Sequence, residues 1–442
     1  MEIFNANLEK YRIWVPKSLQ KKLSKHFLRV ELTSGERNGC FVTKINHDGR
    51  IIIHKEVREY LDLKPNDGCN VCIVPLKNAK RLKKELHANR FDVLAYVPEM
   101  TMSGFEILAL SKKNKIYLWY QAKGRPNEIE VERFLLPEFA RFLGYYQAEG
   151  GKLKLKERRG REFNFTNKSP IIVEDFIKLS KSLIDINLWV VTIRYNPKIE
   201  KSRLDDAVLF LASNGITREK LKMHPATRIR DYTFSFRIGN SILAELVSRM
   251  MDVTRHQNEM NFSKYFLQGL IAGDGCFSSN VDKNGSLHTA IRIFEPNLEY
   301  IRDYASAMGK FGIFGKFKKD AKKNFFIFTA SLNWNSLLKI YELDLLKFTK
   351  HQNRLVKSII QHKKYKSMKH LVHVPLKFQR VIRLPERGRT YLNSWLRDRT
   401  EEGILQRIDE SGKNLWVLTK KGVYVKKMME KIQYDLNLGT KN

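Results

Sequence analysis

Two acidic residues, Glu149 and Asp274, each end a short segment of the same design. The segments are Phe142–Gly150 and Leu267–Gly275, and in both an apolar helical run closes with an acid followed by glycine. Two carboxylates a few ångströms apart repel each other, and burying both as anions is costly unless a cation lies between them. A hard divalent ion such as Mg²⁺, with Mn²⁺ as the alternative, is the expected occupant, and waters and substrate phosphate oxygens would be its other ligands.

Small residues would allow the two helices to meet. Four residues form the predicted helix interface, two in each helix at positions i and i+4: Gly144, Ala148, Gly269 and Gly273. If these faces pack together, Glu149 and Asp274 lie side by side as the predicted catalytic acids. The glycine after each acid lets a helix stop in a left-handed turn and continue as a strand. The predicted metal site therefore comprises Glu149, Asp274, Gly150 and Gly275.

At these residues the chain strongly resembles the LAGLIDADG homing endonucleases, in the single-chain form that carries both motif helices. The segments before the motifs, Arg125–Gly144 and Asn261–Gly269, are similar to that family as well. One apolar run ending in Asp-Gly is common by chance, so the alternative is two ordinary core helices that end in glycine; two motifs, each followed by strands, favour the family. The family's frequent Asp two positions before each acid is replaced by Gln147 and Ala272. Since the family's metal ligand is the acid before the final glycine, this departure does not by itself argue for inactivity.

The resemblance implies a mechanism and a partner. It implies metal-dependent cleavage of double-stranded DNA across the minor groove, with a short 3′ overhang and a long, tolerant recognition site. Glu149 and Asp274 would lie near a pseudo-twofold axis of a monomer, each acid serving one strand. A basic residue such as Lys316 or Lys318 would help to stabilise the transition state.

The composition agrees with a nucleic-acid partner. With 81 Lys and Arg against 47 Asp and Glu, the 442-residue chain has a formal net charge of +34. Such a field attracts phosphate backbones, although charge alone leaves open a generically basic cytoplasmic or thermophilic protein. Neither a signal peptide nor an apolar run of membrane-spanning length is present in the sequence, so we expect a soluble, cytoplasmic, nucleoid-associated protein of prokaryotic type without a membrane partner.

The central region is predicted to hold two copies of one unit, helix-strand-strand-helix-strand-strand-helix. Alternating residues and amphipathic runs predict these elements of the first copy: strands 161–167, 190–195 and 232–237, helix 170–183, and an inserted helix 203–213. The same patterns predict these elements of the second copy: strands 288–294, 313–318 and 325–329, and helices 297–308 and 334–345. The fold class is therefore α+β, with two pseudo-symmetric αββαββα halves and antiparallel DNA-binding sheets.

Alternation along these strands predicts two chemically different faces. One face is apolar and is expected to be buried against helices: Phe163, Phe165, Ile193, Phe234, Phe236, Ile291, Phe317, Phe326 and Phe328. The other face carries donors and cations and is the predicted DNA-binding face: Asn164, Thr166, Thr192, Arg194, Thr233, Ser235, Arg237, Arg292, Lys316 and Lys318. These side chains suit phosphates and base edges in the major groove, whereas the alternative is a solvated outer face.

The N-terminal region holds a second internal repeat. Residues 11–23 and 49–61 share a pattern of Arg-Ile, Lys and Leu that predicts a short strand turning into a helix. Residues 40–76 resemble the AbrB/SpoVT-type swapped-hairpin domain, so one chain could supply both halves of a domain that usually needs two chains. Such domains bind DNA, but a structural or dimerising cap is the alternative. Further strands are predicted at 91–97, 105–110 and 116–121.

Cysteine and histidine pairs give weaker signals. Cys69 and Cys72 have the spacing of a zinc pair, but they lie in an alternating run that would point them to opposite faces, and no second pair lies nearby. We therefore expect structural burial and no zinc. His370 and His373 have no acids or cysteines beside them and are expected to face DNA or solvent.

The C-terminal region changes character after about residue 368. Helices are predicted at 384–396 and 401–408, followed by a strand and a closing helix from Leu415 onward. The run from Trp416 to Gly422 resembles the wing strand of winged-helix domains, and a small helical bundle packed on the core is the alternative. The predicted domains are thus 1–80 (AbrB/SpoVT-like), 81–134 (β-rich connection), 135–255 and 256–366 (the two halves) and 367–442 (winged-helix-like).

Three functions remain open at this stage. The first is a free-standing homing endonuclease, and the second is a DNA-binding transcriptional regulator built on a core that no longer cleaves. The third is an intron RNA maturase, which would prefer structured RNA to duplex DNA. Retention of both acids favours the endonuclease, because an inactive core has no physical reason to keep two repelling carboxylates together.

Overall fold

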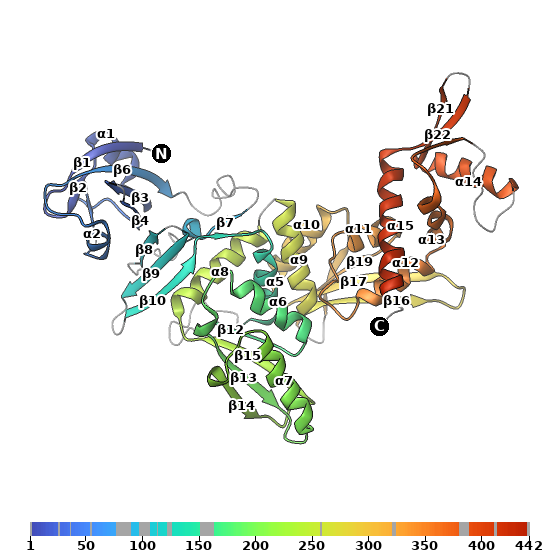
Figure 1. Cartoon of the computed structure of the whole chain (residues 1–442), viewed down its shortest axis with the longest axis horizontal. Coiled ribbons are helices and arrows are strands. Elements are labelled where there is room, and N and C mark those ends of the chain that lie inside the picture. Colours follow the sequence, from blue (N-terminus) through green and yellow to red (C-terminus); the bar gives the residue numbers. More distant parts are fainter. Residues whose placement is uncertain are drawn as a thin grey trace. The chain divides into compact units, whose positions relative to one another are not determined.

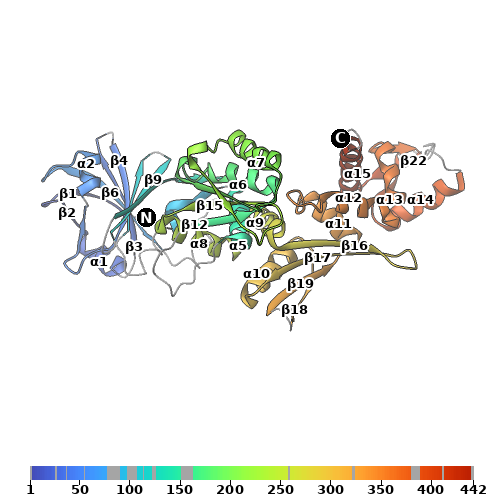
Figure 2. The ribbon, with the colours of Figure 1, turned by 90° about the horizontal axis from the view of Figure 1, so that it is seen from below.

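A computed structural model of the chain describes residues 2–24, 27–35, 37–53, 55–76, 90–96, 107–112, 114–121, 126–150, 163–256, 259–320, 324–379, 389–410 and 413–439. The chain divides into two compact units. Figure 1 and Figure 2 show its helices and strands, coloured along the sequence. Unit 1 comprises Met1–Asp274 with Arg302–Ala307, and unit 2 comprises Gly275–Ile301 with Met308–Asn442. Both acids of the doubled motif thus belong to unit 1. Among the described helices, none has the length and hydropathy needed to cross a membrane.

Unit 1 begins with a seven-stranded antiparallel sheet in the order β1-β6-β3-β4-β8-β9-β10. Its strands, in chain order, are β1 (Glu2–Asn7), β3 (Phe27–Ser34), β4 (Arg37–Thr43), β6 (Gly68–Leu76), β8 (Ile107–Lys112), β9 (Lys115–Gln121) and β10 (Pro126–Glu132). The strand predicted at 116–121 is therefore confirmed as β9, and the described part of the strand predicted at 105–110 lies in β8. Strand β10 was not predicted.

The two N-terminal repeats form the same local structure. Strand β2 (Arg12–Trp14) leads into helix α1 (Lys17–Leu23), and β5 (Arg50–Ile52) leads into α2 (Lys55–Leu61), as predicted. Strands β2 and β5 pair antiparallel with Ile13 opposite Ile51, and both isoleucines are fully buried in one apolar core. The repeats therefore fold against each other within one chain.

Cys69 and Cys72 lie on β6 and differ in burial. Cys69 is buried, its thiol contacts the carbonyl oxygen of Ala6 at 3.6 Å, and this burial raises the pKa of the thiol. Cys72 is half-buried, as the alternation of a strand requires for a residue three positions away.

The strand predicted at 91–97 is wrong for most of its described length. Only Phe91–Asp92 form a strand, β7, which pairs with β11 (Phe134–Leu135), and Val93–Tyr96 form a 3₁₀ turn. The ring of Phe91 is fully buried, 4.6 Å from the ring of Phe262 and 5.9 Å from that of Phe139, measured between centroids. Packing against the motif helices, rather than a strand ladder, explains the apolar residues of this segment.

The remainder of unit 1 alternates helices with a second sheet. In chain order it contains α5 (Phe139–Glu149), β12 (Phe163–Asn167), α6 (Pro170–Ser180), β13 (Val190–Tyr195), α7 (Lys201–Ser213), β14 (Leu221–Pro225), β15 (Tyr232–Ile238), α8 (Ser241–Arg255) and α9 (Met260–Asp274). The sheet order is β12-β15-β13-β14, antiparallel except for the parallel pair of β13 and β14. Helix α6 covers the apolar face, where the Phe176 ring stacks on Phe165 with a centroid distance of 3.9 Å.

Unit 2 holds an antiparallel sheet in the order β16-β17-β19-β18 and a C-terminal part. The sheet and its helices are β16 (Gly275–Val281), β17 (Leu287–Glu295), α10 (Leu298–Gly309), β18 (Lys316–Asp320), β19 (Phe325–Ser331) and α11 (Trp334–Glu342). The C-terminal part comprises α12 (Gln352–Gln361), α13 (Lys363–Met368), β20 (Lys377–Gln379), α14 (Arg389–Glu401), β21 (Leu405–Glu410), β22 (Lys413–Leu418) and α15 (Lys420–Gly439). Its three strands form a small antiparallel sheet in the order β20-β22-β21.

The helix predicted at 401–408 is wrong. Helix α14 ends at Glu401, Gly403 adopts φ +69°, which favours glycine, and β21 follows. Ile404 and Leu405 are buried, so tertiary packing and pairing with β22 decide the structure here.

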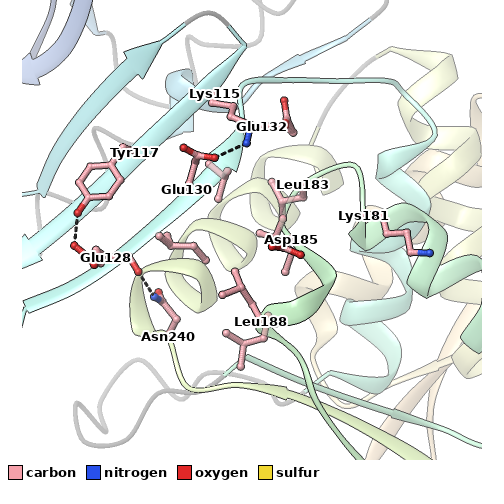
Figure 3. Close-up of a pocket in the computed structure, with 14 residues that line it drawn as sticks. Lys115, Tyr117, Glu128, Glu130, Glu132, Lys181, Leu183, Asp185, Leu188 and Asn240 are labelled. Carbon is pink, nitrogen blue, oxygen red and sulfur yellow. Dashed lines mark hydrogen bonds and ion pairs between the residues drawn. The ribbon is translucent and has the colours of Figure 1, made fainter. Parts of the chain in front are cut away.

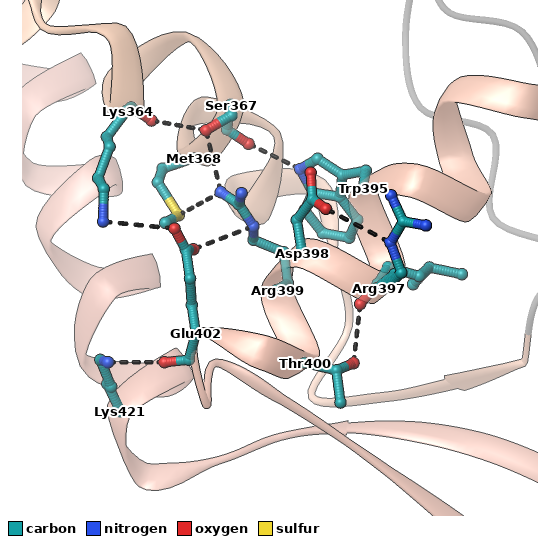
Figure 4. Close-up of polar contacts among 11 residues, drawn as sticks. Lys364, Ser367, Met368, Trp395, Arg397, Asp398, Arg399, Thr400, Glu402 and Lys421 are labelled. Atoms are coloured by element: carbon teal, nitrogen blue, oxygen red, sulfur yellow. Dashed lines mark hydrogen bonds and ion pairs between the residues drawn. The ribbon is translucent and has the colours of Figure 1, made fainter.

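In the C-terminal part, buried polar contacts connect helix α14 to helix α13 (Figure 4). The guanidinium of Arg399 is almost fully buried, donates to Ser367 Oγ at 2.9 Å and pairs with Glu402 at 3.2 Å. Trp395 Nε1 donates to the carbonyl oxygen of Ser367 at 2.7 Å. These contacts tie α14 to α13.

Helix α15 forms hydrogen bonds with the end of α11 and with the residues that directly follow it. Tyr424 donates to Glu342 at 2.8 Å, and Lys431 bonds to Asp344 at 3.1 Å. The prediction that His370 faces DNA or solvent is wrong, because this side chain is buried where α15 packs on the turn Lys369–His373. His373 is exposed.

Candidate functional site

The two motif helices, α5 and α9, pack directly against each other. A Cβ atom built on Gly144 would lie 2.2 Å from the carbonyl oxygen of Phe266, and one on Gly269 would lie 2.1 Å from that of Arg141. Real Cβ atoms do not come this close to backbone oxygens, so both positions require glycine. The backbones of α5 and α9 therefore touch at these two residues.

The carboxyl ends of the two helices also meet. A Cβ atom on Gly273 would lie 2.4 Å from Cβ of Ala148 and 3.2 Å from Cγ of Glu149. The Glu149 side chain therefore lies against the last turn of α9, whose final residue is Asp274. Both acids are half-buried. The packing brings together all four predicted helix-interface residues, and it places Glu149 against Gly273, the residue before Asp274.

The left-handed turn predicted at Gly150 is wrong. Gly150 has φ −79° and ψ 157°, which is extended backbone that any residue can adopt. Glycine is required there because a Cβ would lie 2.2 Å from Cδ2 of Tyr146, whose ring is buried. Gly150 then bridges to Phe165 of β12, and Gly275 pairs with Ile293 as the first residue of β16. Both glycines thus connect a motif helix to a sheet.

Asn167 holds the Glu149 carboxylate. Its Nδ2 donates to Oε1 of Glu149 at 3.1 Å, and its own Oδ1 accepts from the backbone N–H of Ser169 at 2.8 Å. Asn167 is 8 % exposed, and it was not predicted as a site residue. One signal was available: Asn167 is the polar residue at a position where alternation from Phe163 and Phe165 demands a buried side chain.

Burial raises the pKa of Glu149, and the nearby positive charge of Lys168 opposes this shift. A raised folded-state pKa stabilises the fold below the ordinary carboxyl pKa, and this contribution is lost as the pH rises through the raised value. We therefore expect Glu149→Gln, which cannot ionise, to raise the melting temperature of the metal-free protein at neutral pH and to change it little at acid pH. Thermal unfolding in a chelator at both pH values measures this. A lower melting temperature for the variant at neutral pH would contradict the assignment.

A buried ion pair links α5 to α6. Arg141 binds Asp175 of α6 through two hydrogen bonds, Nε to Oδ2 at 2.5 Å and Nη2 to Oδ1 at 2.8 Å. Tyr145 donates to the same carboxylate at 2.9 Å, and Arg141 Nη1 donates to Gln268 of α9 at 3.1 Å. Burial alone would lower the pKa of Arg141, but the hydrogen bonds and charge of Asp175 raise it overall. One network thus links α6, α5 and α9.

Replacing Asp175 by asparagine is expected to destabilise unit 1 by about 3–5 kcal/mol, because it leaves the buried Arg141 charge unpaired. Chemical unfolding measures the loss. Asp205→Asn, which removes an exposed carboxylate from α7, is the matched control and should lie within about 0.5 kcal/mol of the wild type. Equal stability of both variants would show that the pair does not support the helices.

The first sheet places most of the predicted DNA-binding residues on one face. Pairing across β12, β15 and β13 puts these residues side by side: Asn164 opposite Arg237, Thr166 and Thr192 opposite Ser235, and Arg194 opposite Thr233. Arg194 and Arg237 are exposed, and Asn164, Thr166, Thr192 and Thr233 are half-buried. Ser235 was predicted to face DNA, but its side chain is buried. It is only 6 % exposed, and its hydroxyl accepts a hydrogen bond from the hydroxyl of Thr166 at 3.1 Å. It supports the face from within and is not accessible enough for a DNA contact.

The second sheet shows the same alternation of polar and apolar side chains, but the predicted burial of one residue is wrong. Arg292 and Lys316 both lie opposite Thr329, and Lys318 lies opposite Ile327, so the three cations share a face, and all three are exposed. The opposite face buries Ile291 and Phe328. Phe317 belongs to that apolar face but is 43 % exposed, so its predicted burial is wrong. It lies on β18, the edge strand of the described sheet, which has a neighbouring strand on one side only; Phe326 is half-buried.

A cavity of about 510 Å³ lies elsewhere in unit 1, lined by β9 and β10 on one side and by residues 181–188, Ile238 and Asn240 on the other (Figure 3). Its acidic lining residues are Glu128, Glu130, Glu132 and Asp185, and its basic ones are Lys115 and Lys181. The excess of acids is unsuited to a phosphate backbone. The cavity marks the joint where the N-terminal sheet meets the core, since Asn240 donates to the carbonyl oxygen of Glu128 at 3.0 Å.

The donors at the motif helices fit a hard divalent cation. Within the described residues no group of three or more His, Cys, Asp and Glu side chains gathers around one point, so a cage built from protein alone is not present there. Mg²⁺ does not require such a cage, because it commonly binds through one or two carboxylates and keeps waters or phosphate oxygens as its other ligands. Glu149 and Asp274 are such a pair.

Comparison with protein families matches one part of the chain, which includes α9. A family model described as a LAGLIDADG-like domain matches residues 261–352. No curated protein sequence matches the chain significantly.

Solved structures give weaker matches. A structure of mesophilic variants of the homing endonuclease I-DmoI is 18 % identical and covers 51 % of this chain and 96 % of its own, with a TM-score of 0.29. The N-terminal LAGLIDADG domain of WhiA is 16 % identical and covers 52 % of this chain and 86 % of its own, with a TM-score of 0.26. PHS018 from Pyrococcus horikoshii is 22 % identical and covers 17 % of this chain and 94 % of its own, with a TM-score of 0.16. TM-scores this low do not establish a shared fold, so the family likeness rests on the family model: residues 261–352 of the chain are similar to a LAGLIDADG-like domain.

Proposed function

We propose that the chain is a site-specific double-strand DNA endonuclease of the LAGLIDADG homing type, with Glu149 and Asp274 as its catalytic acids. The observation that carries this proposal is the contact of Gly273 with Ala148 and Glu149, which joins the acid-bearing ends of α5 and α9. Two ordinary core helices would have no reason to end in half-buried acids beside each other.

The proposal treats residues 135–255 and 256–366 as two pseudo-symmetric halves. Equivalent ladders support it: Gly150 bridges Phe165, which pairs with Phe236, and Gly275 pairs with Ile293, which pairs with Phe328. In each half the glycine that follows the motif helix is bridged to one strand, β12 or β17, and that strand pairs on its other side with the next one, β15 or β19. The internal symmetry would let a monomer present one acid to each DNA strand.

A divalent metal would be held by the carboxylates of Glu149 and Asp274, with Gly150 and Gly275 at the helix ends beside it. Bound there, Mg²⁺ or Mn²⁺ would polarise the scissile phosphate and lower the pKa of a water. Asn167 would hold the Glu149 carboxylate in a fixed orientation through its hydrogen bond. The raised pKa of Glu149 means that protons compete with the cation for this carboxylate at lower pH.

Duplex DNA would contact the polar faces of the two sheets. In the first sheet the exposed cations are Arg194 and Arg237, and in the second they are Arg292, Lys316 and Lys318. A net charge of +34 would drive association through phosphate contacts and counterion release. Of the predicted contact residues, Ser235 is excluded by its burial.

The additional modules favour a second candidate, a DNA-binding transcriptional regulator that does not cleave. The N-terminal repeats pair through β2 and β5, which supports the AbrB/SpoVT-like interpretation with both halves in one chain. In the C-terminal part the hairpin of β21 and β22 follows α14, which supports a winged-helix-like module. Either module would extend binding without adding to hydrolysis.

The deciding experiment is incubation of the chain with a library of random duplex DNA in Mg²⁺ and in Mn²⁺, followed by sequencing of the ends. Recurrent cuts at related sequences with short 3′ overhangs would support the endonuclease. Tight, salt-sensitive duplex binding without cuts would support the regulator, and preference for structured RNA over duplex DNA would support a maturase.

A further inference from the structure

The segment between Pro197 and Arg230 adds a strand to the first sheet. Helix α7 crosses from β13 to β14, and β14 then pairs in parallel with the outer edge of β13. In the described part of the unit 2 sheet, the edge strand β18 has β19 as its neighbour and no further strand beyond it. The first sheet is therefore one strand wider on this side, where β14 lies beside β13 (Figure 1).

The added segment is fixed to the sheet by specific contacts. Ala207 and Leu211 of α7 are buried, and the ring of Phe210 lies 5.5 Å from that of Phe234 on the apolar face. Arg203 Nη2 binds Asp231 Oδ2 at 2.6 Å at the start of β15. Because α7 covers the apolar side, the uncovered side of β14 is the polar one.

The register places two side chains of β14 on the polar face. Lys222 lies opposite Thr192, and His224 lies opposite Arg194. Both side chains are exposed, and neither was among the predicted DNA-binding residues, because this segment was interpreted as an insertion. Met223, between them, is also exposed but belongs to the other face, opposite Ile193.

The charge of this segment is complementary to DNA. Between residues 218 and 230 the exposed cations are Arg218, Lys220, Lys222, Arg228 and Arg230, and the only acid is Glu219. Exposed cations on and beside an edge strand also prevent edge-to-edge aggregation, but that role does not require Lys222 of β14 to share a face with Arg194.

We propose that β14 extends the DNA-binding face of the first sheet, and that Lys222 and His224 contact the phosphate backbone of duplex DNA beyond the part bound by β12, β15 and β13. This inference rests on the proposed function. Lysine binds phosphate as a point charge, and a histidine N–H can donate to a phosphate oxygen. The footprint on DNA is therefore longer at one end.

The test compares the full chain with the double variant Lys222→Ala/His224→Ala on a duplex of random sequence and on a duplex selected by the wild type. We expect affinity to fall about 10-fold, the slope of log affinity against log salt to decrease by roughly one to two, and the footprint to shorten at one end only. Met223→Ala, on the opposite face of the same strand, is the matched control and should leave all three unchanged. Arg237→Ala, in the centre of the face, should weaken binding without shortening the footprint.

The outcomes separate this inference from the proposed function. If the wild type binds duplex DNA and the double variant has the same affinity, salt slope and footprint, β14 has no role in binding and the proposed function is untouched. If the wild type does not bind duplex DNA, both proposals fail. Circular dichroism spectra of all variants should match that of the wild type, since the changed side chains are exposed.

Discussion

Exchange of Glu149 for glutamine, or of Asp274 for asparagine, is expected to reduce Mg²⁺-dependent cleavage roughly 1,000-fold or more. Each exchange keeps the shape of the side chain but removes a negative charge that holds the cation. In the proposed site both carboxylates hold the metal and the ends of α5 and α9 touch, so either single exchange should impair cleavage of both strands, and the double variant should lose little more than either single variant. Initial rates on a duplex that the wild type cleaves measure the effect.

Binding provides the internal control for this prediction. Loss of negative charge beside the phosphates should leave duplex affinity unchanged or increase it. Asp205→Asn, on the exposed side of α7, controls for removal of a carboxylate elsewhere and should cleave like the wild type. Undiminished cleavage by both single variants would remove Glu149 and Asp274 from the mechanism.

Substitution of Gly144 by alanine is expected to destabilise unit 1 by at least about 1–3 kcal/mol, because the added methyl group cannot be accommodated without moving a helix. The atom it would strike is the carbonyl oxygen of Phe266 at 2.2 Å, and backbone cannot rotate away as a side chain can. Separation of α5 from α9 would also displace Glu149 from Gly273. Chemical unfolding measures the first effect, and the cleavage rate of the folded fraction measures the second.

Gly239 offers the matched control. A Cβ atom there meets no atom within 4 Å, and the residue is not among the glycines with positive φ. Gly239→Ala should therefore be neutral or stabilise the fold by about 0.4–1 kcal/mol. Equal effects at Gly144 and Gly239 would show that the close approach of α5 and α9 does not contribute to stability.

Much of the secondary structure was predictable from local periodicity. Alternation in Val190–Tyr195 predicted β13 with its observed bounds, and the repeat of small residues predicted which faces of α5 and α9 touch. Predictions from the local sequence were wrong where tertiary contacts override the secondary-structure propensity of a segment. Residues 93–96 turn instead of continuing β7, and residues 405–408 form strand β21 instead of a helix.

The errors at individual side chains have a different cause. Alternation assigns Phe317 to the apolar face, but burial also depends on whether the strand is central or at an edge, and β18 is an edge strand. Ser235 belongs to the polar face, yet it lies on the central strand β15 between two neighbours. Strand order is a long-range property, so a single strand's sequence does not contain it.

By itself the sequence determined the chemistry of the candidate site: two acids at the ends of two helices with small-residue faces, in a strongly basic chain. Only the tertiary structure decided what surrounds those acids, namely the hydrogen bond from Asn167 to Glu149, the Arg141–Asp175 pair beneath α5, and the strand β14 that widens one sheet. The physical reason is that residue types and local spacing specify helices and strands. Contacts between segments far apart in the chain arise only when burial of the apolar faces selects one packing arrangement.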